Sequence, residues 1–155
     1  MRRRDREVTD YNKMIAIVAE CDCCRLGLVD ENGAYIVPLN FGYEEVNGRL
    51  LFYFHGAAAG KKMDLIRTQE TASFEMDRKH QLAQGKTACA YSYFYQSIMG
   101  NGKIQIVNEY DEKVHALNVL MSHYCVQNEW DFNREQVDRI AVIKMEVTNW
   151  SCKEH

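Results

Sequence analysis

The chain has 155 residues, 46% apolar and 26% charged, a composition typical of a globular protein with one sizeable core. Its 19 basic and 22 acidic side chains give a formal charge of −3, so the molecule as a whole is not built to attract nucleic acid. No apolar run approaches the roughly 18 residues of a membrane-spanning helix, and no signal-peptide core follows the basic start. We therefore expect one cytoplasmic domain over residues 1–155, with residues 1–8 as a flexible basic tail.

The first half of the chain predicts one helix and three antiparallel strands. Thr9 or Asp10 can cap the helix, because apolar residues recur at helical spacing after them. Strands are expected at 23–29, 34–43 and 50–54, separated by turns at 30–33 and 47–48. The only proline, Pro38, falls inside the second of these strands. Since proline cannot donate a ladder hydrogen bond, that strand should lie at a sheet edge or be bulged there.

The second half predicts further strands and two helices. The expected elements are a helix at 56–68, a strand at 71–76, a loop at 77–86, an aromatic strand at 89–95, a bend at 100–102, continued pairing at 103–107, a helix capped by Asp111 and a closing strand at 140–147. Glycine at a bend suits a barrel corner. The predicted fold is mainly β: about six strands in a closed or nearly closed antiparallel barrel, with helices plugging its ends.

Residues 49–66 form the stretch that is richest in functional signals. The apolar strand Leu50–Phe54 breaks at His55-Gly56 into a turn of small residues, and Gly60-Lys61-Lys62 then opens a helix. Free backbone N–H groups and two lysines at a helix start predict an anion-binding cradle. The alternative is an ordinary strand-to-helix turn with two solvated lysines, because the stretch lacks the Gly-Lys-Ser/Thr ending of a Walker motif.

The six cysteines allow a second kind of site. Three of them cluster as Cys21-Asp22-Cys23-Cys24, which could be a zinc or redox element. However, no second Cys/His pair stands at finger-like spacing, and the absence of an export signal favours reduced thiols. We therefore expect no metal site and interpret these thiols as side chains that fill a helix–strand junction.

Four stretches together resemble a known superfamily. They are Val37–Tyr43, Leu51–Ala57, Gly60–Leu65 and Tyr95–Lys103. Their order and spacing are similar to those of the FMN-binding split barrels related to pyridoxamine phosphate oxidase, and within these to the nitroimidazole-resistance (Nim-type) proteins. The resemblance covers nearly the whole chain.

The resemblance implies a homodimer that holds FMN in clefts between its two barrels. Lys61 and Lys62 match the residues that grip the FMN phosphate, Val37 to Phe41 match the strand that runs along the flavin ring, and Ser97 matches a strand that faces the cofactor or the partner. The cofactor-binding residues implied in this way are Val37, Pro38, Leu39, Asn40, Phe41, Phe54, His55, Gly56, Gly60, Lys61, Lys62 and Ser97. Lys153 stands where relatives carry Thr-Gly-Lys, but the sequence around it is Trp-Ser-Cys-Lys.

His55 is the implied catalytic residue, as a proton donor or a substrate-positioning group near the ring; the alternative is a histidine that only hydrogen-bonds the turn. We expect the chain to lack the C-terminal Arg-containing segment with which the true oxidases recognise substrate, and therefore do not expect oxidation of pyridoxamine phosphate. The resemblance predicts an FMN-dependent oxidoreductase that reduces small acceptors such as nitroimidazoles, with neither nucleic acid nor membrane as partner. The alternatives are a flavin-binding protein without turnover, and a thiol or metal sensor built on the cysteine cluster.

Overall fold

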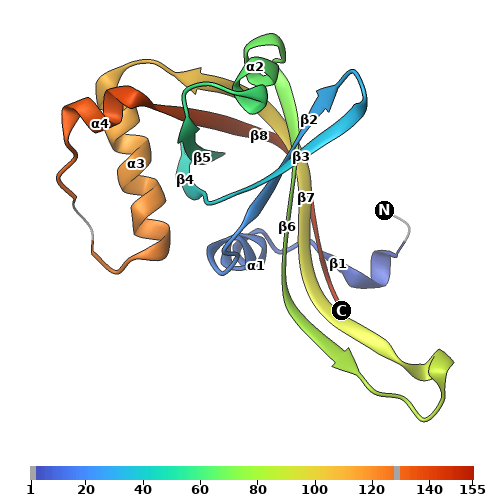
Figure 1. Cartoon of the computed structure of the whole chain (residues 1–155). Coiled ribbons are helices and arrows are strands. Elements are labelled where there is room, and N and C mark those ends of the chain that lie inside the picture. Colours follow the sequence, from blue (N-terminus) through green and yellow to red (C-terminus); the bar gives the residue numbers. More distant parts are fainter. Residues whose placement is uncertain (1–2, 128–129) are drawn as a thin grey trace.

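The computed structural model describes residues 3–127 and 130–155, which form one eight-stranded sheet with helices around it (Figure 1). The strands are β1 Glu7–Val8, β2 Cys24–Asp30, β3 Gly33–Leu39, β4 Gly42–Val46, β5 Arg49–Ala57, β6 Thr71–Ala83, β7 Ser92–Val107 and β8 Ile140–Glu154. The α-helices are α1 Tyr11–Ala19, α2 Lys61–Thr68, α3 Tyr110–Tyr124 and α4 Arg134–Arg139, and the short 3-10 helices are η1 Arg4–Arg6 and η2 Ala88–Ala90. No helix within the described ranges is long and apolar enough to cross a membrane.

The sheet is antiparallel and open, with the strand order β3-β2-β6-β7-β8-β5-β4. Its two edge strands, β3 and β4, follow one another in the chain and are joined only by Asn40 and Phe41. Six strand spacings would separate these edges by about 29 Å in a flat sheet, which two residues cannot span. The sheet must therefore curl strongly, and the chain itself links its two edges.

Mainly β architecture with peripheral helices is confirmed, whereas the predicted count of six strands is wrong. Eight strands form the sheet, and among the described residues no ladder pairs β3 with β4 to close it. Pro38 lies in the edge strand β3, as predicted, and it pairs only with Arg25 of β2. Its missing N–H therefore costs no hydrogen bond inside the sheet.

Several predicted boundaries were wrong because pairing with neighbouring strands extends or shifts the elements. The expected loop at 77–86 is strand as far as Ala83, because a bulge after Arg78 lets β6 continue its pairing with β7. The bend expected at 100–102 is only a register shift between β7 and β8. The helix expected from residue 56 begins at Lys61, since Gly56 and Ala57 still pair in β5.

Two further expectations also differ from the structure at the helices and the N-terminus. Tyr110 opens α3, so Asp111 lies in its first turn and is not its cap. Residues 4–8 of the expected flexible tail are ordered: η1 is followed by β1, which pairs Val8 with Cys152 of β8. The sequence patterns also missed α4, a helix of only six residues. Residues 1–2 of the tail lie outside the described residues.

The core lies inside the curl of the sheet. Three phenylalanines, Phe41, Phe52 and Phe54, are fully buried there. The Phe52 and Phe74 rings pack edge to face, with their centroids 5.0 Å apart. At one end Asp10 caps α1: its carboxylate accepts a hydrogen bond from the Lys13 N–H at 3.1 Å, as the sequence allowed. Met63 of α2 belongs to the same cluster and Val37 of β3 packs against it, so this core connects β3, β5 and α2.

Candidate functional site

The start of α2 carries the features predicted for an anion cradle. Gly60 is the N-cap residue with a φ of +112°, a backbone conformation that favours glycine. No side chain caps the helix, and the N–H groups of Met63 and Asp64 both bond to the Gly60 carbonyl. The first backbone N–H groups of α2 therefore point out of the helix start, where the helix dipole favours negative charge.

The two lysines of this helix start have different environments. Lys61 forms an ion pair with Asp30 at the end of β2, and its ammonium lies 5.0 Å from the centre of the Tyr35 ring. The hydrogen bond that the Lys61 ammonium donates to the Asp30 carboxylate raises the pKa of Lys61, and the same contact lowers the pKa of Asp30. Lys61 is thus neutralised within the chain.

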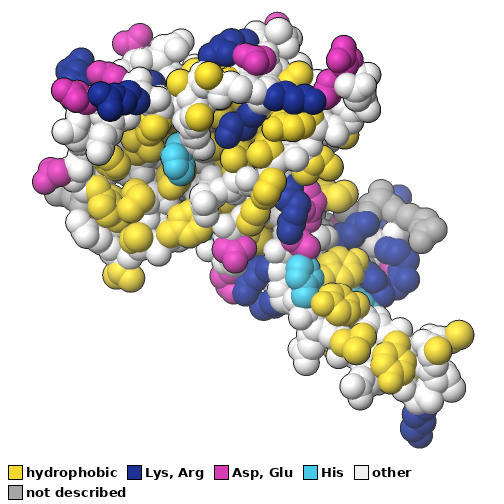
Figure 2. Space-filling model, in the orientation of Figure 1, with side chains coloured by type: hydrophobic (Ala, Val, Ile, Leu, Met, Phe, Trp, Pro, Cys, Tyr) yellow, Lys and Arg dark blue, Asp and Glu magenta, His cyan; other side chains and the backbone are white. Residues whose placement is uncertain are grey.

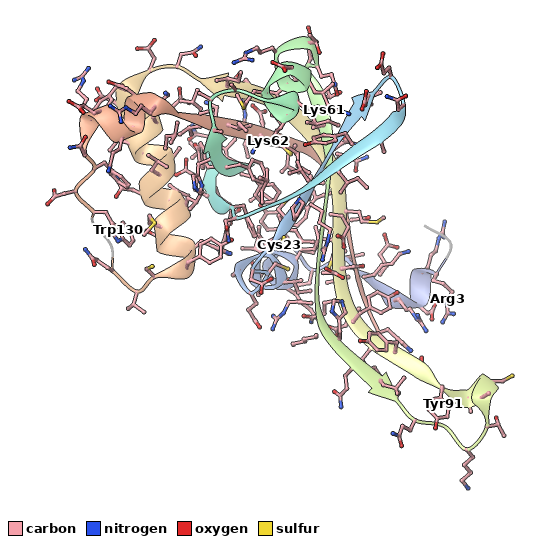
Figure 3. All side chains as sticks on the ribbon, in the orientation of Figure 1. Arg3, Cys23, Lys61, Lys62, Tyr91 and Trp130 are labelled. Carbon is pink, nitrogen blue, oxygen red and sulfur yellow. The ribbon has the colours of Figure 1, made fainter. Side chains whose placement is uncertain are left out.

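Lys62 is half-buried and has no ion-pair partner in the described part of the chain. Its ammonium lies directly over Gly56, where an added Cβ would come within 2.6 Å of Nζ. Burial lowers the pKa of Lys62, because the charged form loses solvation without gaining a counterion. A desolvated, unpaired cation beside free backbone N–H groups is the arrangement that an anion would stabilise. Figure 3 shows both lysines at this end of the molecule.

His55 lies on β5 immediately before Gly56 and pairs with Val142 of β8. The residue is exposed, but partial burial of its ring lowers its pKa, and the Lys62 cation lowers it further. His55 is therefore neutral at pH 7 and can donate or accept a hydrogen bond. This charge state favours the positioning role over the proton-donor role while Lys62 has no counterion.

The remaining implied ligands of the flavin ring divide into side chains that can reach a ligand and side chains that cannot. Phe41 and Phe54 are fully buried, so these two could meet a cofactor only through their backbone. Val37 and Leu39 point into the core, whereas Pro38 and Asn40 are exposed. Because β3 pairs with β2 alone among the described strands, its other backbone edge is open to a ligand.

The strand register does not bring Ser97 next to His55. It pairs with Asp77 and Lys153, whereas His55 is connected through Val142 to Val107 of the same strand. Ten residues of β7 separate Ser97 from Val107, which corresponds to about 33 Å along the strand. Lys153 lies beside Ser97 and is equally remote from the cradle.

Two of the three cysteines in the cluster, Cys21 and Cys24, do not have the character of reactive thiols, whereas Cys23 is partly exposed. Cys21, Cys24 and Cys152 are buried as free thiols. Burial raises the pKa of Cys21 to about 12 and that of Cys152 to about 11, and it also raises the pKa of Cys24. Protonated, enclosed thiols are weak nucleophiles and poor metal ligands. Over residues 3–127 and 130–155, no group of three or more His, Cys, Asp or Glu side chains could hold a metal ion.

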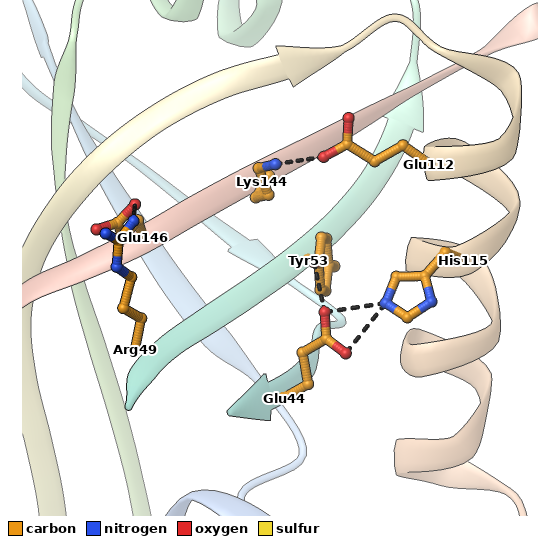
Figure 4. A network of polar contacts seen from close by, with 7 residues as sticks. All are labelled: Glu44, Arg49, Tyr53, Glu112, His115, Lys144 and Glu146. Atoms are coloured by element: carbon orange, nitrogen blue, oxygen red, sulfur yellow. Dashed lines mark hydrogen bonds and ion pairs between the residues drawn. The ribbon is translucent and has the colours of Figure 1, made fainter. Parts of the chain in front are cut away.

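Sequence reasoning missed a polar network between α3 and the β4–β5 hairpin (Figure 4). The Glu44 carboxylate accepts a hydrogen bond from the Tyr53 hydroxyl at 2.6 Å and meets His115 Nε2 at 2.9 Å. Nearby, Lys144 of β8 pairs with Glu112 of α3. These residues come from four elements, and no local motif links them; alternation along β4 and β5 could only have shown which side chains share a face.

A sheet that curls until the chain joins its edge strands, with an uncapped helix start and an unpaired lysine at one end, defines a split-barrel protein with a candidate anion site. The chain belongs to the pyridoxamine 5'-phosphate oxidase family, whose sequence profile matches residues 10–154. This confirms the resemblance drawn from the sequence. No curated protein matched the chain.

Solved structures share this fold over nearly the whole chain. A proposed 5-nitroimidazole antibiotic resistance protein from Bacteroides thetaiotaomicron is 28% identical with a TM-score of 0.82, covering 96% of this chain and 86% of that one. The flavocytochrome Anf3 from Azotobacter vinelandii is 16% identical with a TM-score of 0.83, over 100% and 72% of the two chains. A FAD and heme binding protein from Mycobacterium smegmatis is 15% identical with a TM-score of 0.80, covering 96% of this chain and 73% of that one. At 15–16% identity the last two show the fold alone.

Proposed function

We propose that this protein binds FMN and is a flavin-dependent oxidoreductase that reduces small acceptors such as nitroimidazoles. The observation that carries the proposal is Lys62, a half-buried cation without a counterion at an uncapped helix start. A phosphate group bears close to two negative charges and several acceptor oxygens, so it would satisfy both the lysine and the backbone N–H groups. The similarity to a proposed nitroimidazole resistance protein supports the choice of acceptor.

Each part of the candidate site has a role in this proposal. Lys62 and the start of α2 hold the phosphate, and the open backbone edge of β3 from Val37 to Asn40 meets the polar edge of the ring. Bound flavin supplies the electron transfer, which no protein side chain provides. Neutral His55, next to Gly56, orients the acceptor through a hydrogen bond.

The proposed functional unit is a homodimer with the cofactor between subunits. Support comes from the separation of Ser97 from His55 along β7, because one chain leaves the implied ligands in two groups. In this proposal Ser97 lies on the part of β7 that faces the partner. Light scattering at micromolar concentration measures the state, and a monomer that carries a full complement of flavin would contradict it.

Titration of the protein with FMN and with riboflavin, followed by flavin fluorescence, tests the phosphate site. Loss of a charge-assisted hydrogen bond costs about 1.5–3 kcal/mol, so Lys62→Ala should weaken FMN binding by about tenfold to a hundredfold. Riboflavin, which lacks the phosphate, should bind the variant and the parent almost equally. Lys61→Ala is the matched control, and we expect a smaller loss because Asp30 already neutralises Lys61. Equal FMN titrations of Lys62→Ala and the parent would refute the site.

Turnover separates this proposal from flavin binding without catalysis. Dithionite or a reduced nicotinamide should bleach the bound flavin, and a nitroimidazole should restore its absorbance. His55→Ala should retain FMN but slow the reoxidation, since His55 orients the acceptor and does not hold the phosphate. If reduced flavin is not reoxidised by any nitro compound faster than free flavin, the protein is a binding protein only.

A further inference from the structure

A hollow of about 460 Å³ lies between the first half of α3 and the segment that leads into α4. Three aromatic side chains, two carboxylates and one amide line it; they are Tyr110, Asp111, Asn118, Trp130, Asp131 and Phe132. We call this region the α3 hollow. Its volume lies within the range of small-molecule sites. None of the residues implied in flavin binding lines it.

The α3 hollow lies apart from the other features of the surface. The ribbon of residues 79–95 projects from the side of the molecule away from α3 (Figure 1), and Figure 2 shows hydrophobic side chains gathered along that ribbon. Trp130 lies beside α3, well separated from Lys61 and Lys62 at the start of α2 (Figure 3). A ligand in the α3 hollow would therefore be a different molecule from one held at α2.

The three aromatic side chains of the hollow are all half-buried. Tyr110 and Phe132 pack against the second core cluster, which includes Tyr53 and Val142, so the core holds their rings in place. Trp130 supplies the third ring. Aromatic faces carry a negative quadrupole, and several of them around one space attract a cationic group as well as an apolar one.

The charge of the lining selects between these two kinds of group. Asp111 and Asp131 are exposed, and neither forms an ion pair with a residue that the structure describes. No lysine or arginine lines the hollow. His115 also borders it, but its Nε2 lies 2.9 Å from Glu44, another carboxylate. Lys113, the basic residue nearest in sequence on α3, donates to the Ile140 carbonyl at 3.1 Å. The hollow therefore favours a positive ligand and disfavours a phosphate.

The chain itself places a cation on one of these rings. The Arg134 guanidinium, at the start of α4, lies 4.4 Å from the centre of the Tyr110 ring. Arg134 does not line the hollow, so it leaves the space between the rings open. Its position shows that this end of α3 stabilises a positive charge against an aromatic face.

We propose that the α3 hollow binds a small organic cation of the alkylammonium or quaternary ammonium class. The three rings would surround the ammonium group, and the two carboxylates would supply the opposite charge. The Asn118 amide N–H is already bonded to the Val114 carbonyl at 3.0 Å, so its Oδ1 is left to accept from a hydroxyl or N–H of the ligand. The site is independent of the proposed flavin function and adds a second ligand to the protein.

Tryptophan fluorescence tests the site with choline as the probe. The chain has two tryptophans, so Trp150→Phe leaves Trp130 as the reporter. The control ligand is 3,3-dimethyl-1-butanol, which has the shape of choline without its charge. Choline should change the Trp130 emission saturably and bind about tenfold more tightly than the alcohol. No saturable response to choline, or equal affinities for the two compounds, would overturn the proposal. Saturation by inorganic phosphate instead would also overturn it.

Charge variants test the two carboxylates. The Asp111→Asn, Asp131→Asn double variant changes exposed positions only, so far-UV circular dichroism should match the parent, and choline binding should weaken about fivefold. Glu109→Gln is the control for Asp111→Asn: Glu109 is exposed beside α3, caps no N–H with its side chain and does not line the hollow. Parental affinity of the double variant, or equal losses in Glu109→Gln and Asp111→Asn, would refute the site.

Calorimetry tests the aromatic part without a fluorescent reporter. Trp130→Leu should lose at least about tenfold in choline affinity, because the leucine side chain has no quadrupole to attract the ammonium. Trp150→Phe is the matched control: its ring meets Tyr11 edge-on at 5.9 Å and does not line the hollow, so choline should bind as in the parent. If Trp130→Leu retains the parental affinity, the rings do not form the site and the proposal is wrong.

Discussion

Two clusters of charged side chains at the sheet differ in whether their charges are satisfied. Beneath α3, Glu44 is held by Tyr53 and His115, and Lys144 is held by Glu112 (Figure 4). At the start of α2, Lys62 is half-buried and lacks a counterion within the described residues. A half-buried charge without a partner costs free energy, while a paired one links two elements. The comparison separates charges that link two elements of the fold from a charge that would gain its partner in the proposed anion.

The largest effect on stability should come from breaking the satisfied cluster. Lys144→Met leaves the half-buried Glu112 carboxylate without its cation, so the free energy of unfolding should fall by about 1–3 kcal/mol. Lys62→Met removes a cation that has no partner, so it should leave the free energy of unfolding unchanged or raise it. Urea unfolding of both variants measures the difference. The comparison fails if Lys62→Met is the more destabilised of the two.

A double variant sharpens this result. Adding Glu112→Leu to Lys144→Met removes the orphaned carboxylate and should recover most of the lost stability, because the cost lies in the unpaired charge. If the double variant is no more stable than Lys144→Met alone, the loss comes from packing of the lysine stem and not from charge.

A smaller loss is expected from the neutral member of the network. Tyr53 is 3% exposed and its hydroxyl donates to Glu44, so Tyr53→Phe should lower the free energy of unfolding by about 1 kcal/mol, or a Tm decrease of about 2–4 °C. Tyr11 also donates to a carboxylate, that of Glu45 at 2.6 Å, but at the surface. Tyr11→Phe is therefore the matched control and should cost less than half as much. Equal decreases in the free energy of unfolding for the two variants would show that burial does not strengthen the contribution of the Tyr53 hydrogen bond.

The pH dependence of His55 should report the unpaired charge of Lys62. The pKa of His55 in the folded chain is below the ordinary histidine pKa. At a pH near the ordinary pKa, His55 therefore binds more protons in the unfolded chain than in the folded one. Stability should therefore fall as the pH decreases through about 6.5, the usual histidine pKa, and His55→Gln should flatten this fall. His123 also has a pKa lowered by burial, so His123→Gln is measured beside it.

A ring-proton NMR titration of His55 then tests the cause. Inorganic phosphate bound at Lys62 should raise the pKa of His55, and Lys62→Met should raise it without phosphate, because both remove the repulsion of the cation. If neither changes the titration of His55, the lysine does not influence the histidine, and the link between the two residues is wrong.

The smallest expected effect concerns Lys61. Asp30→Asn removes its partner and leaves a lysine free to reach a bound phosphate, so FMN binding should tighten by less than about threefold, as for other exposed charges. The effect should vanish in the Asp30→Asn, Lys61→Ala double variant. Tightening that survives the removal of Lys61 would come from the net charge of the surface.

The sequence by itself determined most of the local structure and the kind of site that we propose. Apolar periodicity and turn residues placed α1 and most strands, and Pro38 required an edge strand because of its missing N–H. Small residues before Gly60-Lys61-Lys62 indicated an anion cradle, since a helix start has free N–H groups wherever it occurs. These features follow from backbone chemistry within a few residues.

Only the tertiary structure decided which of two adjacent lysines has a counterion within the described residues. Lys61 meets Asp30, 31 residues away in the chain, and Lys62 does not, a distinction that no local pattern contains. The curl of the sheet likewise buries Phe41 and Phe54, and it leaves Ser97 far along β7 from His55. The projecting ribbon of residues 79–95 has the same origin, because much of the loop expected at 77–86 is strand that pairs with β7. Pairing across the sheet depends on residues distant in sequence, so the availability of each group could not be read from its neighbours.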